Sequence, residues 1–145
     1  MATSKPLRVV VIDDDDDSRE MMGVLLESLG HRVECAREGL AGLALIQETP
    51  PDLAIIDLEL PTVSGCEIVQ RLRAAGIATF CAALTGDARP GTRMAALKAG
   101  FHAHLVKPVE FSDLVMLLDS VGVAERATQP TGQASREAVR SSRPD

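Results

Sequence analysis

Several carboxylates in this chain directly follow short apolar runs, an arrangement that could let them act together in chemistry. Asp57 ends the run LAIID, which starts at Leu53, and Pro61 closes the segment. Five consecutive aspartates, Asp13 to Asp17, follow the apolar run LRVVVI. Carboxylates held close together repel one another, and a hard divalent cation such as Mg²⁺, which prefers oxygen ligands, relieves that repulsion. A carboxylate beside such a cation can attack a phosphoryl group and carry it as an acyl phosphate.

Two other polar residues occupy comparable places later in the chain. Thr85 follows the run TFCAAL, and Lys107 follows AHLV. A lysine offers a compact positive charge and a threonine offers a hydroxyl donor, and both suit the oxygens of a transferred phosphoryl group. A plainer interpretation is that the acidic residues form a solvated patch or cap helices and loops. The two interpretations differ in whether these residues meet in space, which depends on the elements that carry them.

The apolar runs and the patterns between them predict strands that alternate with helices. Short runs bounded by turn signals predict strands at Leu7–Ile12, Arg32–Ala36, Leu53–Asp57, Thr79–Leu84 and Ala103–Val106. Apolar residues at helical spacing predict a helix after each strand. This order is typical of an α/β doubly wound domain with a five-stranded parallel sheet and five helices, and ligands bind such sheets at the carboxyl ends of the strands. The polar residues expected to converge there are Asp13, Asp14, Asp57, Thr85 and Lys107.

Capping residues and glycines set the expected ends of the helices. The first helix is predicted to start with Asp17 or Ser18 as its N-cap and to stop at Gly30. Ser64, with Glu67 three residues later, is typical of a capping box at the start of the third helix. In the fourth helix, the residues predicted to face inward are Met94, Ala95 and Leu97.

Composition limits the class of protein. The chain has 145 residues, enough for one domain, and carries 21 acidic against 15 basic residues, with three Phe and no Trp or Tyr, which argues against nucleic acid as a partner. Its three cysteines form no CxxC motif, and no apolar stretch resembles a signal peptide or a membrane span, so we predict a cytoplasmic protein with no membrane partner. We expect an N-terminal extension over residues 1–6, the domain over residues 7–123 and a disordered tail over residues 124–145, where aliphatic residues are scarce.

Four motifs, taken together, resemble the receiver domain of two-component response regulators. They are VVVIDDD, LAIIDLELP with Gly65 beyond it, ALTGDA and HLVKP, and the resemblance covers Leu7 to Gly122. It implies a flavodoxin-like sheet with strand order 2-1-3-4-5. It also implies that Asp57 is the phosphoacceptor, which takes a phosphoryl group from a histidine of a sensor kinase or a histidine phosphotransfer protein. Such a receiver catalyses only its own phosphorylation and dephosphorylation.

The resemblance also assigns a metal site. The ligands that it implies for Mg²⁺ or Mn²⁺ are Asp13, Asp14, Asp57 and the backbone carbonyl of Glu59. Within this set, Asp14 would bind the ion directly and Asp13 would act mostly through water.

Four residues near the two later motifs complete the comparison with the family. Thr85 matches the switch hydroxyl and Lys107 the lysine of the site, followed by Pro108, whose peptide bond is commonly cis in the family. The family usually has Tyr or Phe three residues before the lysine, whereas this chain has His104, an imidazole that is smaller and can carry charge. The face formed by the fourth helix, fifth strand and fifth helix commonly binds a downstream protein or a second copy of the chain.

Three other functions remain open at this point. A Mg²⁺-dependent phosphatase with an aspartyl nucleophile would have a DxDxT pattern on the first strand, whereas Ser18 follows the aspartates here and no residues are left for a cap. A flavodoxin-like FMN carrier would have a hydroxyl- or glycine-rich loop at that place, where the aspartates would repel phosphate. A pseudo-receiver would bind partners without phosphorylation, and it would not require Asp57, Thr85 and Lys107 together.

Overall fold

The five predicted strands form one parallel sheet in the computed structural model, which describes residues 5–128. The strands are β1 (Arg8–Ile12), β2 (Arg32–Ala36), β3 (Leu53–Asp57), β4 (Phe80–Thr85) and β5 (Ala103–Val106). They lie in the order β2-β1-β3-β4-β5, and every neighbouring pair is parallel. The flavodoxin-like strand order implied by the sequence is therefore confirmed.

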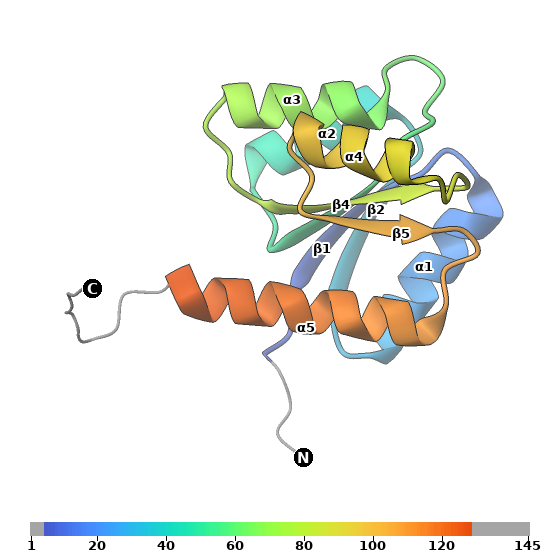
Figure 1. The fold of residues 1–145 in the computed structure, drawn as a ribbon. Coiled ribbons are helices and arrows are strands. Elements are labelled where there is room, and N and C mark those ends of the chain that lie inside the picture. Colours follow the sequence, from blue (N-terminus) through green and yellow to red (C-terminus); the bar gives the residue numbers. More distant parts are fainter. Residues whose placement is uncertain (1–4, 129–145) are drawn as a thin grey trace.

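Helices cover both faces of this sheet. They are α1 (Asp16–Ser28), α2 (Gly39–Glu48), α3 (Gly65–Ala74), α4 (Pro90–Ala99) and α5 (Phe111–Thr128). Figure 1 shows α1 and α5 on one face and α2, α3 and α4 on the other. Because neither face of the central strands meets water, these strands can be apolar at successive positions, as in Val9–Ile12 of β1 and Leu53–Ile56 of β3.

Alternate residues of the central strands supply two separate hydrophobic cores. Val10 on β1 and Ile56 on β3 belong to the core beneath α2, α3 and α4, together with Ile68 of α3. Val9 and Ile55 belong to the core beneath α1 and α5. All five side chains are fully buried, so the central strands and the carboxylates at their ends are held by dense packing on both sides.

The start of α1 differs from the prediction. Asp15, rather than Asp17 or Ser18, is the N-cap, because its backbone is extended and its side chain accepts the Ser18 N–H at 2.8 Å. Asp17 lies inside the first turn, where a negative charge is favourable beside the positive end of the helix dipole. In α3 Ser64 is the N-cap as predicted, since its hydroxyl accepts the Glu67 N–H at 3.1 Å. The other half of the predicted capping box differs, because the Glu67 carboxylate accepts from Arg71 Nη2 at 2.7 Å.

The inward face of α4 was also predicted incorrectly. Ala96 is the buried residue of this helix, whereas Met94 is 54% exposed and Leu97 is 37% exposed, and Ala95 is exposed too. Ala96 joins the core that contains Ala83 of β4. A small side chain lets the helix approach the sheet closely, and the two large side chains remain on the outer surface.

The last helix continues beyond the predicted end of the domain. α5 runs to Thr128, so residues 124–128, which we expected to be part of a disordered tail, are helical. Their sequence, AERAT, contains good helix formers that extend a helix already nucleated. The remainder of the predicted tail, residues 129–145, and residues 1–4 of the predicted N-terminal extension lie outside the described residues.

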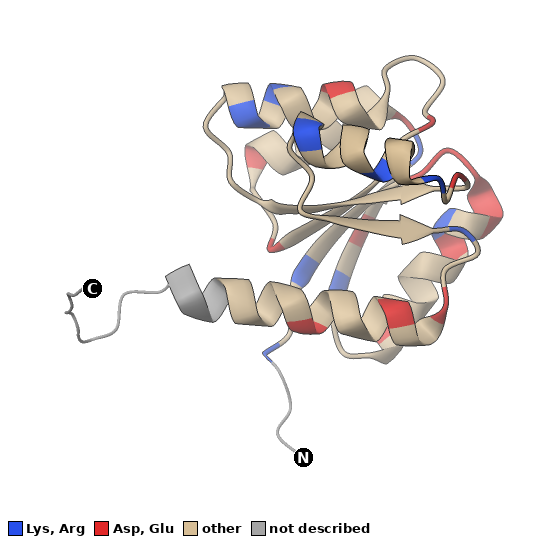
Figure 2. Ribbon diagram, viewed as in Figure 1, with Lys and Arg blue, Asp and Glu red and all other residues tan. Residues whose placement is uncertain are grey.

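Charge is unevenly distributed over the elements. Figure 2 shows acidic residues gathered at the loop after β1 and the start of α1, basic residues on α4 and acidic residues on α5.

Within residues 5–128, no helix combines the length and the apolar character that a bilayer crossing requires.

Candidate functional site

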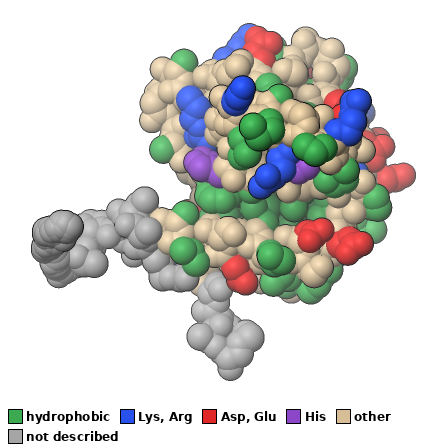
Figure 3. Space-filling model, in the orientation of Figure 1, with side chains coloured by type: hydrophobic (Ala, Val, Ile, Leu, Met, Phe, Trp, Pro, Cys, Tyr) green, Lys and Arg blue, Asp and Glu red, His purple; other side chains and the backbone are tan. Residues whose placement is uncertain are grey.

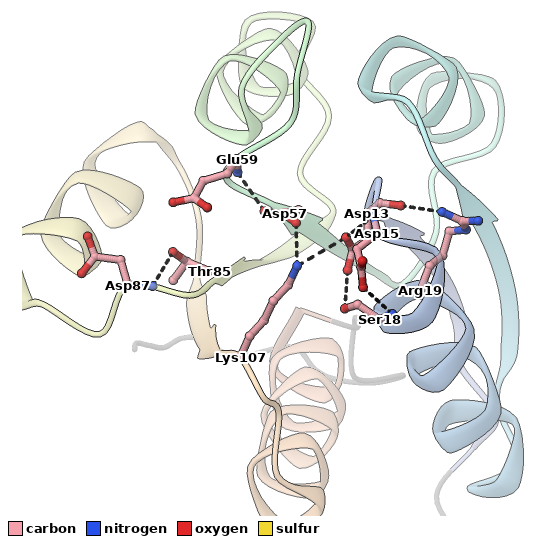
Figure 4. Close-up of polar contacts among 9 residues, drawn as sticks. All are labelled: Asp13, Asp15, Ser18, Arg19, Asp57, Glu59, Thr85, Asp87 and Lys107. Atoms are coloured by element: carbon pink, nitrogen blue, oxygen red, sulfur yellow. Dashed lines mark hydrogen bonds and ion pairs between the residues drawn. The ribbon is translucent and has the colours of Figure 1, made fainter.

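The polar residues at the ends of the strands meet at one edge of the sheet (Figure 4). Asp13 directly follows β1, Asp57 and Thr85 are the last residues of β3 and β4, and Lys107 directly follows β5. Asp13 is fully buried, Asp57 is 4% exposed and Thr85 is 1% exposed. Of the four buried polar residues in the described part of the chain, three therefore lie at this edge, and the fourth is Thr79. The predicted convergence is a property of the fold.

Lys107 lies between the two buried carboxylates. Its Nζ atom donates to Asp57 Oδ2 at 2.8 Å and to Asp13 Oδ1 at 3.4 Å. Burial acts to lower the pKa of Lys107, but the hydrogen bond and charge of Asp57, helped by Asp13, outweigh this effect and raise the pKa. The lysine is therefore held in its cationic form at neutral pH.

Asp57 is in a less favourable environment than Lys107. Burial raises the pKa of Asp57 above its usual range, although the Lys107 hydrogen bond and the Glu59 N–H, which donates to Oδ1 at 2.8 Å, act to lower it. The negative charge of nearby Asp13 raises the pKa further. The site thus contains more carboxylate charge than its single lysine compensates, and an additional cation would be favourable.

The oxygen atoms of the acidic residues are arranged in a way that fits a hard divalent cation. Asp13, Asp14 and Asp57 each offer a carboxylate oxygen, and these atoms all lie within 4.8 Å of one another. Asp13 and Asp57 are buried and Asp14 is exposed, so an ion could enter from solvent beside Asp14. All three potential ligand atoms are oxygens, the ligand type that Mg²⁺ and Mn²⁺ prefer.

The first turn of α1 holds Asp13 in place. The Asp15 N–H donates to Asp13 Oδ1 at 3.0 Å, and the Ser18 hydroxyl donates to Asp13 Oδ2 at 2.5 Å. Arg19 donates from Nη1 to the Asp13 backbone carbonyl at 3.0 Å. Ser18 and Arg19 were not among the predicted site residues. The signal that could have identified them is their place one helical turn after Asp13 and Asp14, on a helix that starts at the site.

Thr85 is joined to the loop that follows its strand. Its hydroxyl oxygen accepts the Asp87 N–H at 3.0 Å. The Asp87 carboxylate in turn accepts hydrogen bonds from Arg89, with Nη2 to Oδ2 at 2.7 Å, and from the Thr92 hydroxyl at 2.7 Å. These bonds, those of Arg89 first, hold the pKa of Asp87 well below its usual range. In Figure 4, Thr85 and Asp87 lie on one side of Lys107, and Asp13, Ser18 and Arg19 lie on the other.

His104 occupies the face of the sheet that also carries Thr85. It pairs with Ala83 on β4, and Ala83, two residues before Thr85, packs in the core beneath α4. The His104 ring is half-buried, and its Nε2 atom is buried without a hydrogen-bond partner among the described residues. The peptide bond between Lys107 and Pro108 is cis, as the resemblance implied.

Among the described residues, neither the cysteines nor the other two histidines form a hydrogen bond with the residues of this site. Burial raises the pKa of the Cys81 thiol to about 11, and burial also raises the pKa of Cys35 and Cys66. All three remain free thiols in the structure. His31 and His102 accept backbone N–H groups of Leu7 and Cys81 at the opposite ends of the strands.

A five-stranded sheet in this order, with an acidic cluster, a threonine and a lysine at the carboxyl ends of its strands, defines the receiver class of signalling domains. Comparison with known proteins agrees. The family model described as "Response regulator receiver domain" matches residues 9–119. The chain belongs to this family, whose members are generally signalling modules rather than enzymes.

Individual relatives cover the chain to different extents. An uncharacterised 14.6 kDa protein of Leptolyngbya boryana is 33% identical over 86% of this chain and 96% of its own length. The response regulator MprA of Mycobacterium sp. (strain KMS) is 34% identical over 76% of this chain, which spans about half (48%) of that relative. The solved structure of the chemotaxis response regulator CheY4 of Vibrio cholerae is 28% identical in sequence and superposes with a TM-score of 0.75. The match covers 81% of this chain and 99% of the CheY4 chain.

Proposed function

We propose that Asp57 accepts a phosphoryl group from a phosphohistidine of a sensor kinase or a histidine phosphotransfer protein. One observation carries this proposal. Asp57 is nearly buried at the end of β3, its Oδ2 lies 2.8 Å from Lys107 Nζ, and the oxygens of Asp13 and Asp14 lie within 4.8 Å of its own. In this setting Lys107 can neutralise part of the negative charge of an incoming phosphoryl group. The neighbouring aspartates form a pocket suited to a metal ion.

The transfer reaction is a displacement at phosphorus. A carboxylate oxygen of Asp57 forms a bond to phosphorus while the bond between phosphorus and the donor imidazole nitrogen breaks, and the electron pair of that bond stays on the imidazole. The product is an acyl phosphate on Asp57. Lys107, which is held cationic, donates to the phosphoryl oxygens. Hydrolysis of the acyl phosphate by water later restores the carboxylate, and Glu59 and Asp87 flank the path of that water.

Mg²⁺ or Mn²⁺ fits the acidic pocket. Its ligands would be Asp13, Asp14, Asp57 and the backbone carbonyl of Glu59. The bound ion would neutralise the phosphoryl oxygens and reduce the repulsion between the incoming group and the aspartates. Asp14, which is exposed, would bind it directly, and Asp13 would act mostly through water.

The response to phosphorylation would spread from Thr85. Its hydroxyl turns toward the new phosphoryl oxygens, which pulls the loop that it holds through the Asp87 N–H. His104, on the same face of the sheet, moves into the space beside Thr85, where its buried Nε2 can gain a partner.

The surface that changes is formed by α4, β5 and α5, and we infer that it binds a downstream protein or a second copy of the chain. Figure 3 shows hydrophobic side chains along this face, with basic residues above them and acidic residues below. The large apolar residues that α4 exposes are Met94 and Leu97. Exposed apolar side chains bordered by opposite charges are typical of a protein-binding surface.

Mass spectrometry of the intact protein tests the phosphoacceptor. Incubation with acetyl phosphate and Mg²⁺ should add one phosphoryl group to the wild-type protein, and chelation of the metal should prevent the addition. Asp57→Asn should abolish it, whereas Asp113→Asn, which changes an exposed acid on α5, should not. An adduct of the same yield in Asp57→Asn would refute the assignment, and the absence of any adduct in the wild type would favour a pseudo-receiver.

A further inference from the structure

The first turn of α1 surrounds Asp13 with hydrogen-bond donors. Asp13 is fully buried, so both of its carboxylate oxygens need donors from the protein. Oδ1 receives the Asp15 N–H at 3.0 Å and Lys107 Nζ at 3.4 Å. Oδ2 has one donor among the described residues, the Ser18 hydroxyl at 2.5 Å. Within the described chain, Oδ2 is therefore held by Ser18 alone, whereas two donors hold Oδ1.

We propose that Ser18 is a positioning residue for the metal site, because its hydroxyl fixes the Asp13 carboxylate in the orientation that serves a bound divalent cation. This inference rests on the proposed function, and it adds a residue of α1 to the site. Outer groups that orient a ligating carboxylate commonly change metal affinity when they are removed. Ser18 acts through Asp13, which by our assignment contacts the ion mostly through water.

The helix itself does not need a serine at this position. Ser18 is the third residue of α1, and its own N–H is already satisfied by the side chain of Asp15 at 2.8 Å. The hydroxyl is therefore free to donate to Asp13. Alanine has a higher helix propensity than serine, so Ser18→Ala should preserve α1 while removing the donor. The role of the hydroxyl can thus be separated from the folding of the helix.

Loss of the hydroxyl would alter Asp13 in a predictable way. Without Ser18, Oδ2 is left buried with no donor from the described protein, beside the negative charges of Asp14 and Asp57. The carboxylate would then rotate toward another donor, and the oxygen atoms would no longer be arranged for the ion. The affinity for a divalent cation should fall even though all three carboxylates remain.

Titration with Mn²⁺, followed by the electron paramagnetic resonance signal of the free ion, measures this affinity without phosphorylation. Ser18→Ala should weaken Mn²⁺ binding about 10-fold, the lower end of the range typical when such outer groups are removed. Ser18→Thr keeps a hydroxyl and should restore the affinity to within about 2-fold of the wild type. Ser28→Ala is the matched control, because Ser28 lies on the same helix and its hydroxyl donates to the Leu25 carbonyl at 2.7 Å, away from the site.

The titration separates failure of this inference from failure of the proposed function. If the wild type binds Mn²⁺ and Ser18→Ala, with an unchanged melting temperature, binds it equally well, then Ser18 has no positioning role. Weak binding by both Ser18→Ala and Ser18→Thr would also overturn the inference, since the hydroxyl would not be the cause. If the wild type fails to bind Mn²⁺, or if Asp14→Asn binds it as tightly as the wild type, the metal site itself is wrong.

Discussion

Gly65 is the point at which α3 touches the strand end that carries Asp57, and replacing it should perturb both fold and function. Its N–H donates to the Leu58 carbonyl at 3.2 Å. A β-carbon at this position would lie 2.4 Å from the backbone oxygen of Asp57 and 3.0 Å from the Leu58 Cα atom. Carbon and oxygen atoms approach to about 3.3 Å at closest in ordinary contacts, so Gly65→Ala requires a backbone shift of about 1 Å.

The loss of stability in Gly65→Ala depends on which atoms must move. The obstructing atoms belong to the backbone, so no side-chain rotation relieves the contact, and α3 cannot retreat freely because Ile68 and Leu72 are fully buried. Overpacking of this kind costs about 1–3 kcal/mol as a rule, and we expect about 3 kcal/mol here. For a domain of this size, that corresponds to a fall in melting temperature of about 12 °C.

Urea unfolding followed by far-ultraviolet circular dichroism gives the free energy of unfolding of the variant. Gly91→Ala is the control, since a β-carbon there would have no heavy atom within 4 Å beyond its chain neighbours and its own helix backbone. Because alanine has the higher helix propensity, α4 should be no less stable in this variant. The yield of the acetyl phosphate adduct should fall in Gly65→Ala and remain unchanged in Gly91→Ala. A Gly65→Ala protein within about 0.5 kcal/mol of the wild type would show that α3 can shift at little cost, and the close contact with Asp57 would not restrict position 65 to glycine.

Two further predictions concern His31 with His102, and Lys107. His31 and His102 each accept a backbone N–H at Nδ1, and burial lowers the pKa of both rings, with the charge of Arg73 adding to the effect on His102. A folded pKa below the unfolded value means that their stabilising contribution is complete above about pH 6.5 and is lost as the pH falls through that value toward the folded pKa. The double variant His31→Asn, His102→Asn should therefore lose less of its free energy of unfolding than the wild type between about pH 7.5 and about pH 5.5. The raised pKa of Asp57 has the opposite effect on stability, but this effect is the same in the wild type and the double variant. Equal losses of the free energy of unfolding in the two proteins would contradict the role of the histidines. Lys107→Ala should leave the fold intact by circular dichroism but remove the change in amide hydrogen exchange that acetyl phosphate and Mg²⁺ produce in α4 and β5; a change as large as that of the wild type would exclude Lys107 from the switch.

Much of the site could be predicted because strand ends in a parallel sheet are fixed by the sequence pattern. The run LAIID defines β3, and its last residue is Asp57 in the structure as predicted. Right-handed crossovers place the carboxyl ends of all five strands at one edge, so Asp13, Thr85 and Lys107 needed no further information. Their convergence depends on topology, which the alternation of strands and helices specifies.

Features that depend on local competition or on available space could not be predicted in the same way. Each of the five consecutive aspartates can cap a helix, and the choice of Asp15 depends on backbone angles rather than residue type. The hydroxyl of Ser18, which the sequence offers as a cap, is instead engaged by Asp13. In α4, Met94 and Leu97 were expected to face inward, but Ala96 is the residue that packs in the core with Ala83.

Asp57 shows how the conflict between a residue and its own strand can mark that residue as functional. Its neighbours Ile55 and Ile56 are fully buried, and at 4% exposure Asp57 occupies an environment that is almost as enclosed. An apolar residue at position 57 would suit the packing, whereas a carboxylate there must lose water, as its raised pKa reflects. Lys107 and the Glu59 N–H reduce this cost without removing it, because Asp13 brings a second negative charge to the same place. Such a conflict is expected where function, rather than stability, determines the identity of a residue. A bound cation would reduce the repulsion between Asp57 and Asp13, and a phosphoryl group would change the charge at Asp57. The unfavourable environment of Asp57 therefore makes the site sensitive to both.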